Sequence, residues 1–171
     1  MPKHSEHTIA ILGGGPVGLE AALYARYLGY AVQVYERGEV AEQVRRWGHV
    51  RMFTSFQMNS SPLGLAALAA QDPERPPCEP AALLTGNEWA EHYLQPLAKS
   101  DLLRGHIHPH TEVLAISRIG ALKTDAPGHE ARADQPFRML LRGQDGQTQT
   151  ATAQVVIDTT GVYGNPNWLG P

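Results

Sequence analysis

Three glycines near the N-terminus, Gly13, Gly15 and Gly18, have the spacing of a turn that can hold a pyrophosphate. A bound pyrophosphate needs backbone N–H donors at a helix N-terminus and no side chain in its way. In such a turn Gly13 permits a tight bend, Gly15 permits close approach of the phosphates, and Gly18 permits close packing of helix and sheet. The alternative is a glycine-rich turn with a structural role only. A strand before the turn and a helix after it favour the nucleotide-binding interpretation.

Glu36 follows the glycine-rich turn by about twenty residues, the distance at which dinucleotide-binding proteins place an acidic residue. A carboxylate there can accept hydrogen bonds from a ribose 2′-hydroxyl and would repel a 2′-phosphate, which disfavours NADP at this site. The alternative is a solvated carboxylate at a strand end, paired with the adjacent Arg37. Neither the glycines nor Glu36 distinguishes FAD from NAD.

The residues around these motifs predict the elements that position them. Thr8–Leu12 is a mostly apolar run without charge, typical of a strand buried on both faces of a parallel sheet. A helix should begin at Pro16 and end near Gly29, because proline suits the first helical position and glycine the left-handed cap. Residues 31–36 alternate as a second strand does. Strand, turn, helix and strand together predict a βαβ unit.

The rest of the chain predicts further helices followed by a meander of strands. A short helix over 40–47, a loop over 51–60 and a helix from Ser61 precede a helix over about 85–99, whose Thr85 and Glu88 match a capping box. The expected strands cover, in chain order, 106–119, 137–142, 147–153 and 154–158.

The sequence VVIDTTG at residues 155–161 resembles the second FAD motif of two-dinucleotide-binding flavoproteins. The order of glycine-rich turn, acidic residue, helical insertion, meander and Thr-Thr-Gly turn is similar to that of FAD/NAD(P)-dependent oxidoreductases, including flavin monooxygenases and thioredoxin-reductase-like proteins. This resemblance covers nearly the whole chain. It implies an α/β fold, namely a Rossmann-like doubly wound FAD-binding domain with a parallel sheet and a β-meander crossover, forming one domain over residues 1–171. It also implies a flavoprotein that takes hydride from NAD(P)H.

The resemblance assigns FAD-binding roles to particular residues but no catalytic residue. The residues expected to contact the pyrophosphate are Gly13, Gly15, Pro16, Val17 and Gly18. The other expected contacts are Glu36 at the ribose, the backbone of Val113 at the adenine, and Thr160 and Gly161 near the flavin nucleotide. Arg37, next to Glu36, is also expected to bind the cofactor.

Arg46 and Trp47 stand after the second strand, where proteins of this superfamily approach the pyrophosphate and flavin. The Arg46 guanidinium could offset phosphate charge there. The alternative, a solvated basic turn with a core tryptophan, is equally compatible with the sequence.

A second glycine-rich turn for NAD(P)H and the returning Gly-Asp segment of complete superfamily members do not occur in this sequence. We therefore expect the N-terminal portion of a larger enzyme, or an FAD-binding half that needs a second chain. Two alternatives stay open. One is an NAD-binding dehydrogenase domain, although no lysine follows Tyr24, Tyr27 or Tyr30 at the spacing of a Tyr-x-x-x-Lys pair. The other is a nucleotide-binding module without catalysis.

The composition of the chain indicates which classes of binding partner are not expected. A net charge of −3 and 42% hydrophobic residues describe an ordinary globular chain, so neither nucleic acid nor a membrane is an expected partner. The single cysteine, Cys78, excludes an internal disulfide, and no leader or long apolar run is present, which favours a cytoplasmic location.

His106, His108 and His110 alternate along a strand, but Pro109 and the lack of an adjacent thiol or carboxylate argue against a metal site.

Overall fold

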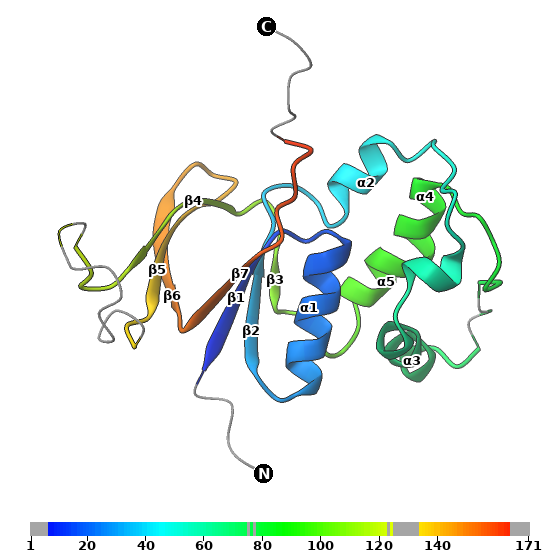
Figure 1. The fold of residues 1–171 in the computed structure, drawn as a ribbon, viewed down its shortest axis with the longest axis horizontal. Coiled ribbons are helices and arrows are strands. Elements are labelled where there is room, and N and C mark those ends of the chain that lie inside the picture. The colour runs from blue at the N-terminus through cyan, green and yellow to red at the C-terminus, as the bar shows by residue number, and fades with distance from the viewer. Residues whose placement is uncertain (1–6, 75, 77, 123, 125–133, 165–171) are drawn as a thin grey trace, which may run out of the picture.

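The computed structural model describes residues 7–74, 76, 78–122, 124 and 134–164. A four-stranded parallel sheet lies in the middle, between helices on one face and a three-stranded antiparallel sheet on the other (Figure 1). The fold is thus the expected α/β, Rossmann-like one. Among the described residues, no helix combines the length and the apolar character that crossing a bilayer requires.

The predicted βαβ unit is present with the predicted boundaries. Strand β1 (Thr8–Leu12) leads into helix α1 (Pro16–Tyr27), and strand β2 (Ala31–Tyr35) returns parallel to β1. Pro16 occupies the first turn of α1, and Gly29 follows its end with φ +88°. Proline and glycine therefore set the two ends of this helix, as the sequence predicts.

Alternate residues of β1 join different cores because a strand presents successive side chains to opposite faces. Ile9 and Ile11 belong to the core with α1. Ala10 and Leu12 belong to a smaller core with Met139 of the antiparallel sheet. Both faces of the parallel sheet are therefore covered, which explains why β1 has no charged residue.

Two further strands complete the parallel sheet. Strand β3 (Ile107–His108) pairs with β2, and strand β7 (Val155–Asp158) pairs with β1, giving the order β3-β2-β1-β7. Strand β1 thus has β2 on one side and β7, the last of the described strands, on the other. In open α/β sheets, a crevice for ligands forms at the carboxyl ends of the strands where the order reverses in this way.

The meander consists of β4 (Glu112–Arg118), β5 (Phe137–Arg142) and β6 (Thr148–Ala153), paired antiparallel in that order. The strand region expected over 106–119 is extended, but it consists of two strands, β3 and β4, in two different sheets. Pro109, which lacks an N–H, and His110, with φ +53°, separate β3 from β4. The chain therefore changes sheets between these strands.

The segment of the chain that connects β2 to β3 is mostly helical. Its helical elements are α2 (Glu42–Arg46), the 3₁₀ turn η2 (Phe56–Asn59), α3 (Pro62–Gln71), α4 (Gly86–Trp89), the π-helical turn η3 (Ala90–Leu94) and α5 (Gln95–Ala98). The capping box at the start of α4 is formed: Glu88 N–H donates to the Thr85 hydroxyl oxygen, and Thr85 N–H donates to the Glu88 carboxylate. The helix expected over about 85–99 is therefore real, with a π turn in its middle.

A buried tyrosine ties this helical layer to α1. The Tyr93 hydroxyl donates to the Glu20 carboxylate and accepts the Ser61 N–H at 2.9 Å. Burial and the bond to Glu20 raise the pKa of Tyr93 to about 12. The hydroxyl thus remains a donor at any physiological pH and joins three helical segments.

Candidate functional site

The glycine-rich turn lies at the carboxyl end of β1, and its three key glycines differ in what surrounds them. Gly13 has φ +102°, and a Cβ there would lie 2.9 Å from the carbonyl oxygen of Thr159. A Cβ on Gly18 would lie 2.0 Å from the Gly13 carbonyl oxygen and 2.7 Å from the Thr159 hydroxyl oxygen. A Cβ on Gly15 would meet nothing within 4 Å. Gly13 and Gly18 are therefore needed for packing, whereas the space beside Gly15 is open at the start of α1.

Glu36 directly follows β2, and two backbone amides hold its carboxylate. The Gly14 N–H donates to Oε2 at 2.6 Å, and the Gly38 N–H donates to Oε1 at 2.8 Å. Each carboxylate oxygen can accept a second hydrogen bond. The carboxylate is thus oriented by the protein beside the glycine-rich turn while it keeps acceptor capacity for a ligand.

The Thr-Thr-Gly turn after β7 packs directly on the glycine-rich turn. The Thr159 hydroxyl donates to the Leu12 carbonyl oxygen at 2.7 Å, and the Thr159 N–H donates to the same oxygen at 2.9 Å. Thr160 donates its N–H and its hydroxyl to Asp158 Oδ1, and these bonds hold the pKa of Asp158 below its ordinary value. The two motifs at opposite ends of the sequence therefore form one structural unit.

A cleft of about 580 Å³ opens at this edge of the sheet. The sequence-predicted residues that line it are Gly13, Glu36, Arg37, Val113, Thr160 and Gly161. Residues that sequence reasoning did not select also line it, among them Tyr35, Thr111, Leu114, Ile116 and Asp158. The two sets meet because the carboxyl ends of β1, β2 and β7 lie beside the start of β4.

An irregularity in β4 shapes the apolar end of the cleft. Val113 pairs with Leu141 and Ile116 pairs with Met139, although the register shifts between Val113 and Ala115. Because paired residues share a face, Val113 and Ile116 both lie on the side of the meander that carries buried Leu141 and Met139. A bulge leaves no clear pattern in a single sequence, which explains why the sequence did not predict Ile116 as a residue of the cleft.

Three of the residues expected to contact the pyrophosphate lie at the start of α1 and do not line the cleft. Gly15 caps the helix, Pro16 is its first residue, and Val17 is 68% exposed. The first N–H groups of a helix have no partner within the helix and carry partial positive charge, so this end suits an anion. The N-terminus of α1 lies beside the cleft, so a single ligand could extend from the cleft to this helix end.

Arg46 and Trp47 are not brought to the cleft. Arg46 donates to Glu42 Oε1 at 2.5 Å, one helical turn earlier in α2, and its side chain is mostly exposed. The Trp47 ring packs on Gly86, where a Cβ would lie 2.7 Å from it. The placement agrees with the alternative of a basic turn and a core tryptophan, because Arg46 is paired with Glu42 and Trp47 packs on Gly86.

The three alternating histidines have separate surroundings. His108 stacks on Tyr35 at 5.2 Å between ring centroids and contacts Gln33, whereas His110 contacts Glu39 at 2.8 Å. Burial lowers the pKa of His106. In the part of the chain that the structure describes, no group of three or more His, Cys, Asp or Glu residues is placed to hold a metal ion.

Comparison with solved structures supports this fold. Bacillithiol disulfide reductase Bdr from Bacillus cereus matches with a TM-score of 0.71 at 19% identity, covering 95% of this chain and 42% of that one. The OTEMO complex with FAD and NADP matches with a TM-score of 0.60 at 21% identity, covering 92% and 26%. S-allyl-L-cysteine S-oxygenase from Allium sativum matches with a TM-score of 0.57 at 16% identity, covering 91% and 36%. The chain spans less than half the length of each of these structures.

Sequence comparison gives the family. No curated protein sequence matches the chain. A family model, described as pyridine nucleotide-disulphide oxidoreductase, matches residues 10–125, which is more than half of the sequence and includes the glycine-rich turn, Glu36 and all of β4. This chain therefore belongs to the pyridine nucleotide-disulphide oxidoreductase family.

Proposed function

We propose that this chain binds FAD and is the cofactor-binding part of a flavin-dependent oxidoreductase or monooxygenase that takes hydride from NAD(P)H. The observation that carries the proposal is the Gly14–Glu36 hydrogen bond, which sets a ribose-binding carboxylate beside a turn suited to a pyrophosphate. The family match and the flavin-containing relative support FAD as the dinucleotide.

The proposed orientation places the pyrophosphate at the start of α1. The space beside Gly15 is open, and the helix N-terminus supplies N–H donors and partial positive charge. Thr159 keeps Gly13 and Gly18 in place, so the turn is formed before the cofactor arrives. Preorganisation of this kind reduces the cost of binding.

The ribose of the ADP half lies at Glu36 in this proposal. Glu36 and Asp158 both line the cleft, and the pKa of Asp158 is held low, so Asp158 is ionised at neutral pH. The Glu36 carboxylate would repel a 2′-phosphate on this ribose, and Asp158 adds a second negative charge to the lining of the cleft. This charge pattern favours FAD or NAD over NADP in the cleft.

The adenine lies at the apolar end of the cleft. Val113 and Ile116 offer apolar contact there, and Arg37 lines the same cleft with a planar guanidinium. A guanidinium can stack on an aromatic ring. We therefore assign Val113 and Arg37 to the adenine and its ribose, and Thr160 and Gly161 to the continuation of the cofactor beyond the pyrophosphate.

When bound, FAD supplies a ring system that accepts and donates hydride, and the protein supplies binding and orientation. The residues of this chain orient the ADP half and, through the start of α1, neutralise the pyrophosphate. The sequence holds only one glycine-rich dinucleotide turn, so we assign NAD(P)H to a further domain or to a second chain.

The direct test is titration of the purified chain, cleared of nucleotide, with FAD, NAD⁺ and NADP⁺, followed by calorimetry. We expect FAD to bind most tightly and NADP⁺ most weakly. Tighter binding of NAD⁺ than of FAD would identify an NAD-binding domain, and absence of binding by all three would remove the nucleotide-binding function from this chain.

A further inference from the structure

Two residues with a left-handed backbone lie next to the loop that follows Glu36. Among the described residues, Ala41 with φ +60° and His110 with φ +53° are the only ones other than glycine with a positive φ. This conformation is unfavourable for any residue that has a Cβ, so it persists only where the surrounding contacts hold it. Such positions cluster at ligand sites, which directs attention to what these two residues bind.

Both left-handed residues hold a glycine that in turn holds the Glu36 carboxylate. Gly14 N–H donates to one carboxylate oxygen of Glu36, and Gly38 N–H donates to the other. The Ala41 N–H donates to the Gly14 carbonyl oxygen at 3.0 Å. The His110 N–H donates to the Gly38 carbonyl oxygen at 3.1 Å. Each oxygen of the carboxylate is therefore held by a glycine whose own carbonyl is held by a left-handed residue.

The glycines need this second contact because glycine has more backbone freedom than any other residue. The direction of the Gly14 and Gly38 N–H groups is therefore not set by steric preferences of these residues themselves. A hydrogen bond to the carbonyl of each glycine restricts its backbone on the side away from Glu36. The two N–H groups then point to fixed positions, and the Glu36 carboxylate takes one orientation.

The local roles of the two left-handed residues do not account for this pairing. Ala41 precedes α2, and His110 lies where the chain passes from β3 to β4. Either position permits an irregular backbone, but neither requires its N–H to donate to a glycine that holds Glu36. The His110 side chain contacts Glu39 where both side chains are partly exposed, and such contacts contribute little. The backbone of His110, and not its imidazole, therefore makes the relevant contact.

We propose that Ala41 and His110 are positioning residues for the ribose-binding carboxylate, an inference that rests on the proposed function of the cleft. Neither residue lines the cleft, so both act through the glycines and Glu36. Their left-handed backbones set the two N–H groups that orient the carboxylate. The acceptor capacity that Glu36 retains is thereby held ready for the 2′-hydroxyl of the adenosine ribose.

The test compares ADP with 2′-deoxy-ADP, which differ only in the 2′-hydroxyl, by calorimetry on the full chain. The parent should bind ADP about tenfold more tightly. His110→Val disfavours a positive φ and should reduce this preference to about twofold, with the affinity for 2′-deoxy-ADP nearly unchanged. His110→Asn tolerates a positive φ and should keep the preference. His7→Val, an exposed position directly before β1, is the matched control.

The outcomes separate this inference from the function on which it rests. If the parent prefers ADP and His110→Val keeps that preference, the positioning role is wrong and the proposed function stands. If His110→Val weakens both probes equally, His110 has a structural role only, and the inference also fails. If the parent binds both probes equally, Glu36 does not bind the ribose, and the ribose assignment and this inference fail together.

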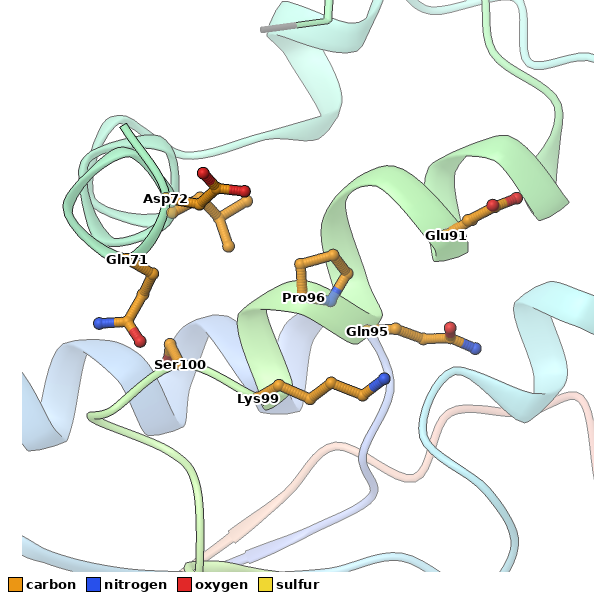
Figure 2. Close-up of a pocket in the computed structure, with 8 residues that line it drawn as sticks. Gln71, Asp72, Glu91, Gln95, Pro96, Lys99 and Ser100 are labelled. Carbon is orange, nitrogen blue, oxygen red and sulfur yellow. The ribbon is translucent and has the colours of Figure 1, made fainter. Parts of the chain in front are cut away.

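Amide hydrogen exchange on the unmutated chain gives a second test that does not depend on the folding of His110→Val. The Ala41 and His110 amides should exchange about threefold more slowly with saturating ADP than with saturating 2′-deoxy-ADP, because a ligand bond to Glu36 stabilises the glycines. The reference is the Lys99 N–H, which donates to the Gln95 and Pro96 carbonyl oxygens beside a hollow that shares no lining residue with the cleft (Figure 2). Equal exchange of Ala41 and His110 with the two probes would refute the positioning role.

Discussion

The backbone N–H of Gly14 donates to Glu36 Oε2 at 2.6 Å, joining the glycine-rich turn to the end of β2. This bond fixes the carboxylate beside the turn before any ligand binds. A Cβ on Gly14 would lie 3.1 Å from the Cβ of Glu36, so the close approach depends on glycine here as well. The hydrogen bond therefore holds the two motifs, whose bonded residues are twenty-two positions apart, side by side.

Replacement of Glu36 tests the ribose assignment. Glu36→Ala should weaken FAD by roughly 1 to 3 kcal/mol, the usual contribution of hydrogen bonds to a charged group. Glu36→Gln keeps an acceptor for the Gly14 N–H and should lose less of the affinity for FAD than Glu36→Ala does. Titration of flavin fluorescence measures both, with Glu39→Ala in the same loop as the control. Unchanged affinity in Glu36→Ala would exclude Glu36 from the site.

Two glycine substitutions should have opposite effects on stability and binding. Gly15→Val should abolish FAD binding and leave the melting temperature nearly unchanged, because the new side chain enters open space at the start of α1. Gly18→Ala should unfold or strongly destabilise the chain, because its Cβ would lie 2.0 Å from the Gly13 carbonyl oxygen. Thermal melts and copurified flavin distinguish the two. A Gly15→Val variant with parental flavin content would refute the pyrophosphate assignment.

Tyr93→Phe tests the link between α1 and the helical layer. The variant leaves the Glu20 carboxylate without its donor and the Ser61 N–H without its acceptor. The free energy of unfolding should fall by about 1 to 3 kcal/mol, with little change in FAD affinity. Tyr27→Phe is the control, because Tyr27 is 64% exposed on α1. Equal urea midpoints for both variants would show that the link does not contribute to stability.

Acid should destabilise the turn after β7 through Asp158. Bonds from Thr160 lower the pKa of Asp158 in the folded protein below its ordinary 3.8. The unfolded chain therefore binds this proton at higher pH than the folded one, so the stabilisation is present above pH 3.8 and is lost as pH falls through the folded value. Asp158→Asn should show a smaller fall in melting temperature below pH 4 than the parent. Parallel pH curves for the two proteins would contradict this expectation.

The chain by itself should not oxidise NADH or NADPH at an enzymatic rate, even when loaded with FAD. Only one glycine-rich turn is present in the sequence, and positioning two reactants against each other is worth roughly 7 to 11 kcal/mol of the barrier. Anaerobic stopped-flow mixing with NADPH, followed by flavin absorbance, measures this. Rapid and saturable bleaching would reveal a nicotinamide site on this chain.

Local features were predictable because they depend on neighbouring residues. The strand over Thr8–Leu12, the start of α1 at Pro16 and the capping box at Thr85 each follow from preferences that act within one or two helical turns. The meander was predictable for the same reason, because the turn near Gly146, with φ +78°, is a local signal between two alternating strands.

The sequence by itself therefore determined the βαβ unit, the glycine-rich turn and the place of Glu36, whereas the tertiary structure decided what surrounds them. Thr159 packs on Gly13 and Gly18 only because β7 pairs with β1, and its bond to Leu12 spans 147 residues. The split of 106–119 between two sheets and the bulge that places Ile116 in the cleft depend on pairing with distant strands. Strand order and register arise from burial of whole faces, a global property that no short stretch of sequence encodes.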